Sequence, residues 1–215
     1  MAFTRRSPQR GLREAAIDLW PVQITAPLPA RRLVPGVATL DGLAFGMGAG
    51  GEMSEVYIER DAVISDCGKY RYLLRRVWDH RCLRGLFVML NPSTADAKID
   101  DATIRSCTRL SRGLGYGSFE VVNLFAWRAT NPAELASSSD PIGTLNDSVI
   151  ESAVSRCDVV ICAWGAHDTR GRDRRVWEIV RSSRPAAFCL GTTKNGSPKH
   201  PLYIKSGTPL EAYSP

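Results

Sequence analysis

The stretch Leu86-Phe-Val-Met-Leu-Asn-Pro-Ser-Thr-Ala-Asp96 decides the fold class of this chain. Its first five residues form a continuous apolar run, too short for a helix and typical of a strand that is buried on both faces of a sheet. Polar and turn-forming residues follow at once, beginning with Asn91-Pro92. We therefore expect a buried strand whose end carries Asn91 to the edge of a sheet.

The sequence after this stretch alternates between helical and extended patterns. Apolar residues recur at helical spacing in three segments, at 104–114, 145–154 and 176–180. Short apolar runs predict three further buried strands, at 119–124, 158–164 and 186–190. Because parallel neighbours need crossover connections, this alternation predicts a three-layer αβα sandwich with a central four-stranded, mostly parallel sheet. In such sheets ligands bind beyond the carboxyl ends of the strands.

Two regions precede the first buried strand. Extended stretches at 56–60 and 69–78 flank Asp66-Cys-Gly68, a turn signal, and predict a β-hairpin. Residues 1–53 are instead rich in proline and arginine and contain a glycine-dense stretch at 46–51. We expect a partly flexible N-terminal extension over 1–53, with a short helix at 12–20, followed by an α/β domain over 54–215.

Composition sets the broad class of partner and compartment. The chain has 28 basic and 22 acidic residues, a net charge of +6, which suits a polyanion such as DNA or a nucleotide without requiring one. Its six cysteines are scattered without a C-x-x-C pair, which indicates reduced thiols and no metal or other cofactor. No apolar run is long enough to cross a bilayer. We expect a cytoplasmic monomer without a membrane partner.

Each predicted strand end delivers polar or small residues. Taken singly, these have ordinary structural explanations, since Asn-Pro is a common turn and Trp-Gly a common strand terminus. Their joint placement at one edge of the sheet indicates a binding site. The residues we expect there, besides Asn91 and His200, are Pro92, Ser93, Thr94, Asn123, Arg128, Trp164 and Gly165.

In order and at comparable intervals, these segments resemble the motifs of the uracil-DNA glycosylase superfamily. That superfamily has Asn-Pro or Asp-Pro after the first strand, a base-reading Asn after the second, a strand ending in Trp-Gly, and a final His-Pro. This chain has Asn91-Pro92, Asn123, Trp164-Gly165 and His200-Pro201. A closer resemblance, over about residues 62–213, is to a bacterial and phage family with a domain of unknown function and the signatures LNPSTAD, DD-x-TIR, VVNLFA-x-R, AWGAH and HPLY.

The superfamily resemblance implies a role for each matched polar residue. Asn91 would hold the attacking water through its amide oxygen, His200 would donate a hydrogen bond to a base carbonyl, and Asn123 would bind the base edge through paired amide contacts. The Asn91 amide is a weak proton acceptor, but it suffices because an oxocarbenium-like sugar needs electrostatic stabilisation more than a strong nucleophile. A flipped base also needs a stacking partner, and three aromatic residues remain open for it: Phe125, Trp127 and Tyr203.

Charged residues near the motifs extend the expected site. Asp96 is a candidate catalytic residue, as a water-activating carboxylate or as a ligand for a hydrated metal, whereas Asp101 fits the cap of the following helix. His167 follows Trp164-Gly165 and is either an assisting group or a solvated loop residue. Beside the His-Pro motif, Lys194 and Lys199 are expected to contact the DNA backbone.

The sequence thus predicts a DNA glycosylase-like hydrolase that cleaves the N-glycosidic bond of a modified or mismatched base. The motifs at 91–96 and 200–203 differ from those of the uracil enzymes, so neither uracil specificity nor insertion of a wedge into the minor groove is predicted. Two alternatives remain open. The same pocket suits a nucleoside or nucleotide hydrolase or a base-modifying enzyme with a small substrate, and it also suits a non-catalytic protein that binds nucleic acid or nucleotide.

Overall fold

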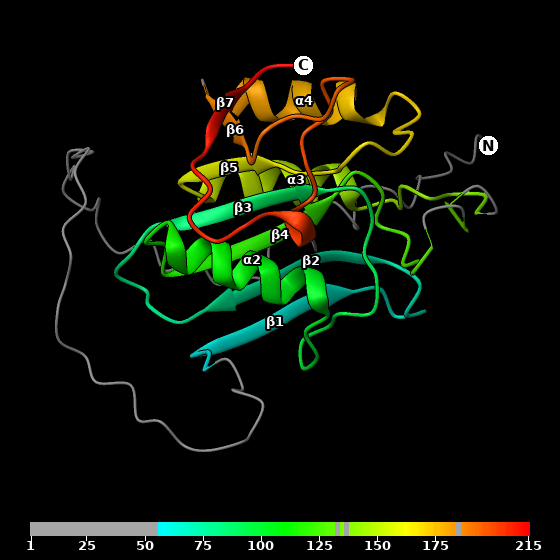
Figure 1. Cartoon of the computed structure of the whole chain (residues 1–215). Coiled ribbons are helices and arrows are strands. Elements are labelled where there is room, and N and C mark those ends of the chain that lie inside the picture. Colours follow the sequence, from blue (N-terminus) through cyan, green and yellow to red (C-terminus); the bar gives the residue numbers. More distant parts are fainter. Residues whose placement is uncertain (1–55, 132–133, 136–137, 184–185) are drawn as a thin grey trace, which may run out of the picture.

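The computed structural model describes residues 56–131, 134–135, 138–183 and 186–215, which form an α/β fold around a seven-stranded mixed sheet. The expected extension over 1–53, with its helix at 12–20, lies outside the described residues. The strands follow one another across the sheet in the order β1-β2-β4-β3-β5-β6-β7 (Figure 1). Their bounds are β1 (Glu59–Ile64), β2 (Arg71–Val77), β3 (Arg84–Met89), β4 (Ser118–Asn123), β5 (Val159–Cys162), β6 (Ala187–Cys189) and β7 (Glu211–Tyr213).

The centre of the sheet is parallel, as the sequence predicts. Strands β4, β3, β5 and β6 run in one direction and correspond to the four predicted buried strands. The predicted hairpin of β1 and β2 adds two antiparallel strands at one edge, and β7, which was not predicted, adds one at the other. Strand β1 lies further along the chain than the expected stretch 56–60, because the turn closes only at Ser65, whose N–H donates to the Tyr70 carbonyl at 3.0 Å.

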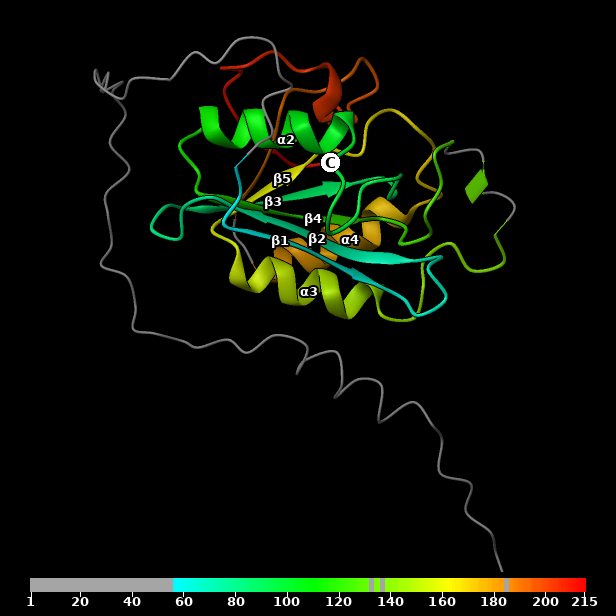
Figure 2. The same cartoon turned by 90° about the horizontal axis from the view of Figure 1, so that it is seen from below.

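Helices cover both faces of the sheet and give three layers (Figure 2). Helix α2 (Ala102–Gly113) lies on one face, and α3 (Asn146–Arg156) and α4 (Arg172–Ser183) lie on the other. A short 3-10 helix, η2 (Pro201–Tyr203), packs against α2. The three helices predicted from apolar spacing are all present.

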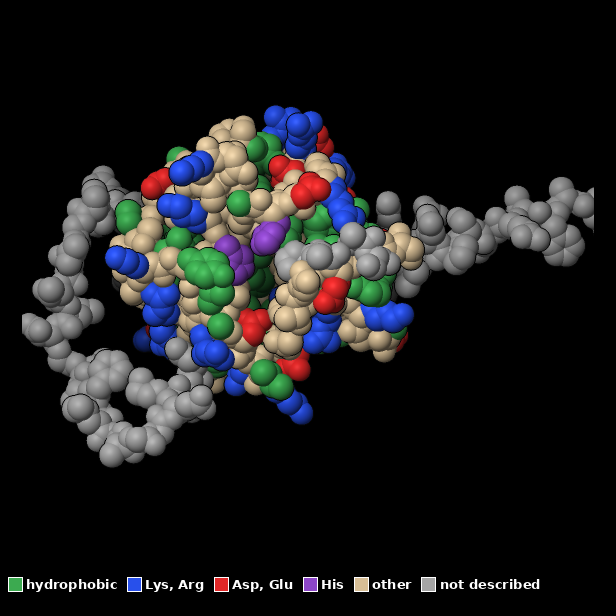
Figure 3. All heavy atoms as spheres, turned by 45° about the vertical axis from the view of Figure 1, so that its right-hand side comes forward, with side chains coloured by type: hydrophobic (Ala, Val, Ile, Leu, Met, Phe, Trp, Pro, Cys, Tyr) green, Lys and Arg blue, Asp and Glu red, His purple; other side chains and the backbone are tan. Residues whose placement is uncertain are grey.

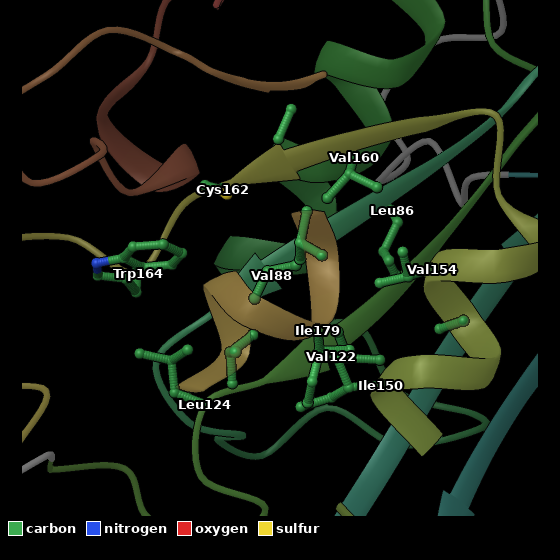
Figure 4. Packing of buried hydrophobic residues seen from close by; sticks show 14 of the residues in the cluster. Leu86, Val88, Val122, Leu124, Ile150, Val154, Val160, Cys162, Trp164 and Ile179 are labelled. Atoms are coloured by element: carbon green, nitrogen blue, oxygen red, sulfur yellow. The ribbon is translucent and has the colours of Figure 1, made fainter. Parts of the chain in front are cut away.

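Two apolar cores, one on each face, explain the continuous apolar runs of the strands. Figure 4 shows the larger core, in which Val88 and Val122 of the sheet pack against Ile150 of α3 and Ile179 of α4. On the opposite face, neighbouring strand residues such as Phe87 pack under α2 in the second core. Each such side chain, once fully buried, contributes about 1.5 to 3 kcal/mol to folding.

The antiparallel strand β2 has its amino end at the edge of the sheet where the parallel strands have their carboxyl ends. Leu74 pairs with Val121 in the antiparallel β2–β4 ladder, so Arg71 lies beside the carboxyl end of β4. Further along β2, the buried Arg76 forms an ion pair with Asp100 at 2.6 Å. Asp100 therefore anchors the loop that leads into α2, a role that the sequence alone did not reveal.

All six cysteines are free thiols, as their spacing predicts. Cys107 and Cys157 are among the four buried ones, and burial raises the pKa of both thiols above their ordinary value. Within the described part of the chain, no helix is long and apolar enough to cross a membrane.

Candidate functional site

A cavity of about 800 Å³ opens where the strand ends meet α2 and η2. Asn91 after β3, Trp164-Gly165 after β5 and His200 before η2 all line it. Figure 3 shows this face of the molecule, with a hollow beside which two histidine side chains lie together. Residues from segments far apart in the sequence are therefore brought to one cavity, at the edge of the sheet where a ligand was expected.

The amide group of Asn91 is fixed in one orientation. Its Nδ2 donates to the carbonyl of Pro92 at 3.0 Å and to the carbonyl of Ala129 at 2.8 Å. Only the NH₂ end of an amide can bond two carbonyl oxygens, so the orientation follows from the partners. The oxygen Oδ1 is left as the hydrogen-bond acceptor that Asn91 can offer to a ligand or a water.

His200 is held as a neutral hydrogen-bond donor. Its Nδ1 accepts from the Leu202 N–H at 3.3 Å, which places the imidazole proton on Nε2. Burial lowers the pKa of His200 below its ordinary value, and the nearby His167 lowers it further, whereas Asp101 acts in the opposite direction. A Cβ at Gly165 would lie 3.5 Å from the His200 Cβ, and Gly165 has φ +79°, so a larger residue there would be strained.

Asp101 combines a structural position with a place in the cavity. Its Oδ1 accepts from the Ile104 N–H at 2.8 Å, which confirms that it caps α2. Asp101 also lines the cavity, and it is the only carboxylate among the described residues that do so. Its second oxygen, Oδ2, is therefore the acidic group that the site can offer to a bound molecule.

Arg71 forms the inner wall of the site, and Asn123 lies against Arg71. Arg71 lines the cavity, is 2% exposed, and donates from Nη1 to the Ala95 carbonyl at 2.8 Å. Asn123 does not line the cavity but lies against Arg71, whose Nη2 is 3.5 Å from the Asn123 Oδ1. Burial lowers the pKa of Arg71 to about 10, and Asp101 offsets part of this effect. This wall is rich in hydrogen-bond donors.

A second, shallower hollow of about 370 Å³ adjoins the cavity. The two share Ser93, Ala129 and Thr130 as lining residues, so one continues into the other. Arg128 and Trp127 line this second hollow. With Lys69 also in its lining and Glu134 as the one carboxylate there, the hollow gives the site a mainly basic and aromatic extension beyond the cavity itself.

The sequence matches the model of one known protein family. Residues 71–202, more than half of the chain, match the model of a family described as a protein of unknown function, DUF1643. The chain belongs to the DUF1643 family. No curated protein and no solved structure matches it. The DUF1643 match begins at Arg71 and ends at Leu202, and both of these residues line the cavity.

Several of the predicted site residues lie in or beside the cavity. Ser93, Trp164, Gly165, Lys199 and Tyr203 line it together with Asn91 and His200. Thr94 and Arg128 line the adjoining hollow instead. Trp164 is also a core residue, since its ring packs edge-on against Tyr213 with 5.7 Å between the centroids.

The structure places other predicted site residues away from the cavity. The role predicted for Asp96 is not supported, because its Oδ1 accepts from the Lys98 and Ile99 N–H groups at 2.7 and 2.8 Å in its own loop. These two N–H groups lower the pKa of Asp96. Phe125 belongs to the core on the α3 and α4 face. Pro92 takes part through its carbonyl, which accepts from Asn91.

Lys194 lies in an exposed turn outside the cavity lining, whereas Lys199 lines it, and the contact of both lysines with a DNA backbone stays a prediction. Paired amide contacts from Asn123 to a base are not supported, because its Oδ1 already faces Arg71. Over the described residues, no group of three His, Cys, Asp or Glu side chains is placed to hold a metal ion.

Sequence reasoning missed Arg71 and underestimated Asp101. The predicted site residues follow the carboxyl ends of the predicted strands, whereas Arg71 lies at the amino end of a strand. A signal was present, because an antiparallel hairpin strand next to a parallel sheet presents its amino end at the edge where the parallel strands end. For Asp101, the capping role was recognised, but a capping residue at the start of α2 also faces the same edge.

Proposed function

We propose that this DUF1643 protein hydrolyses the N-glycosidic bond of a modified or mismatched base in DNA, as its resemblance to the uracil-DNA glycosylase superfamily implies. One observation carries the proposal. Asn91 and His200 line the same cavity, and the Asn91 Nδ2 and the His200 Nδ1 are already engaged by the protein. What remains for a substrate is an acceptor oxygen on one residue and an N–H donor on the other.

This pair of groups suits a reaction in which the base leaves early. The Asn91 Oδ1 accepts a hydrogen bond from a water, whose oxygen attacks the anomeric carbon while the bond from that carbon to the base nitrogen breaks. The bonding electrons leave with the base, and the His200 Nε2–H donates to the base carbonyl on which negative charge accumulates. Asp101 takes the proton released by the water and passes it to solvent, and solvent protonates the departed base. The products are a free base and a sugar hydroxyl.

Tyr203 is the aromatic residue best placed to stack on a base. It lines the cavity and is 83% exposed, and its ring centroid lies 6.4 Å from that of His200. The other two candidates lie elsewhere, since Phe125 is in the core and Trp127 lines the adjoining hollow. Stacking on an aromatic ring contributes about 1 to 3 kcal/mol per base in proteins that bind single strands.

Basic residues around the opening support DNA as the substrate over an isolated nucleoside. Lys199 and Lys205 line the cavity, and Lys69 and Arg128 line the hollow that continues from it. A nucleoside would occupy the cavity alone. A polynucleotide would also engage the continuation, where the Lys69 Nζ lies 5.8 Å from the centre of the Trp127 ring.

Single-turnover release of free base from DNA tests the proposal. We expect N91A and H200A each to lower the rate by at least about a hundredfold, the usual scale for a positioned catalytic group. Asn195→Asp is the matched control, because Asn195 lies in an exposed turn outside the cavity lining and aspartate keeps the oxygen that accepts from the Thr193 hydroxyl, so its rate should equal that of the wild type. Unchanged rates in N91A and H200A would remove both residues from the mechanism.

Two further results would favour the alternatives. Base release that is as fast from mononucleotides as from DNA would indicate a nucleotide hydrolase. Binding of DNA that survives in N91A and H200A, together with no base release by the wild type, would indicate a non-catalytic binding protein.

A further inference from the structure

Four arginines are buried within the described residues, and one of them lacks an ion pair. Arg75 pairs with Glu59 at 3.3 Å, Arg76 pairs with Asp100, and Arg172 pairs with Asp147. Arg71 forms no ion pair with a described residue, although it is only 2% exposed. A buried charge without an ion pair destabilises a fold, and the attraction of Asp101 offsets only part of this effect on Arg71, so the retention of Arg71 calls for an explanation.

Arg71 is also the one among these four that lines the cavity. Its guanidinium has five N–H groups, of which two are engaged, by the Ala95 carbonyl and, more weakly, by the Asn123 Oδ1. The Arg71 Nε and the Asn123 Nδ2 are buried without a hydrogen-bond partner among the described residues. Arg71 therefore brings an unsatisfied donor to the wall of the cavity, and a second unsatisfied donor belongs to the adjacent Asn123, which does not line the cavity.

We propose that Arg71 is the base-selecting residue of this cavity and that the base it selects is a 6-oxopurine, such as hypoxanthine or guanine. The O6 and N7 atoms of such a base are two adjacent acceptors, which match the forked donors of a guanidinium. Adenine presents an amino group beside N7, so a donor of the base would face the donors of the guanidinium. Arg71 thereby acquires the partner that the protein itself does not provide.

The Asn123 side chain reinforces this selection. Because its Oδ1 faces Arg71, only the Nδ2 donor remains for other partners. Asn123 itself does not line the cavity, so Arg71 presents the donors there, and a guanidinium, which has no acceptor, disfavours any base that turns an amino group toward it. This inference rests on the proposed function only in that the cavity takes a nucleobase; it does not require that the base be released.

Calorimetric titration of the full chain with hypoxanthine, adenine and inorganic phosphate tests the inference. We expect hypoxanthine to bind at least about tenfold more tightly than adenine, the scale of one bidentate pair. R71M should abolish this preference, and R71K should weaken hypoxanthine binding by about tenfold because it keeps the charge but loses the fork. Equal affinities for the two bases in the wild type, or phosphate binding without hypoxanthine binding, would overturn the inference.

Thermal melting without ligand distinguishes a binding role from a structural one. R71M removes a buried charge without an ion pair together with its hydrogen bond to the Ala95 carbonyl, so it should melt only slightly lower than the wild type, whereas the matched variant R76M breaks the buried ion pair with Asp100 and should melt clearly lower. A loss in R71M as large as that in R76M would show a structural role and refute the inference.

The same titration separates this inference from the proposed function. Hypoxanthine binding that depends on Arg71, in a protein that releases no base from any DNA, would support the inference and refute the hydrolase. Base release with an unchanged substrate preference in R71K would do the reverse.

Discussion

Replacing Asn91 by aspartate gives a sharp test of how the site is held. The change is isosteric and supplies a stronger base than an amide, so it should raise the rate if only basicity mattered. It also removes the two N–H bonds to the carbonyls of Pro92 and Ala129, at 3.0 and 2.8 Å, and sets a carboxylate oxygen against them. At about 1 kcal/mol per bond, the loss is about 2 kcal/mol before any repulsion.

We therefore expect N91D to be less stable and less active than the wild type. A loss of about 2 kcal/mol corresponds to a melting temperature about 4 to 8 °C lower for a chain of this size. Melting curves and single-turnover base release measure the two effects, and Asn195→Asp, the same change in an exposed turn, should alter neither. An N91D protein that melts like the wild type and releases base faster would refute the fixed amide orientation.

Three further outcomes follow from the site. D101N should keep α2 capped but lose at least about tenfold in base release, while D96N keeps its activity; equal rates in D101N and the wild type would exclude Asp101 as proton acceptor. Burial holds the pKa of His200 below its ordinary 6.5, so the stability that neutral His200 contributes is present above pH 6.5 and is lost as pH falls through the lowered pKa. The rate of base release should fall over the same pH range. The stability difference between wild type and H200Q should shrink between about pH 7 and pH 5. K199A and K194A should each reduce the slope of log affinity for DNA against log salt by about 0.7 to 0.9; an unchanged slope in either variant would place that lysine away from the backbone.

The fold followed from the sequence because its signals are local. The run at 86–90 is apolar throughout, and a strand with both faces covered is the arrangement that buries it completely. Apolar spacing behind Asp101 likewise indicated α2, and the carboxylate that caps the helix marked its start. Strand β7, in contrast, has only three residues and no run of its own, and it exists because β6 offers an edge to pair with.

A site residue could be predicted only under two conditions: it belonged to a recognisable motif, and it followed the carboxyl end of a parallel strand at the edge of the cavity. Asn91 and His200 met both conditions, and both line the cavity. Asp96 met the first without the second, because the loop after β3 turns back on itself and its carboxylate binds the N–H groups of that loop. Arg71 met neither, since its place in the cavity depends on the antiparallel pairing of β2 with β4, a non-local contact that no short segment encodes.

The fate of the oxygen atom from water tests the central claim most directly. The full chain is incubated with DNA carrying hypoxanthine or other modified bases in water labelled with oxygen-18, and the products are weighed by mass spectrometry. The proposed reaction puts the label on the sugar carbon from which the base departs and leaves the released base unlabelled. Label in the base, or no released base from any DNA of the panel, would contradict it.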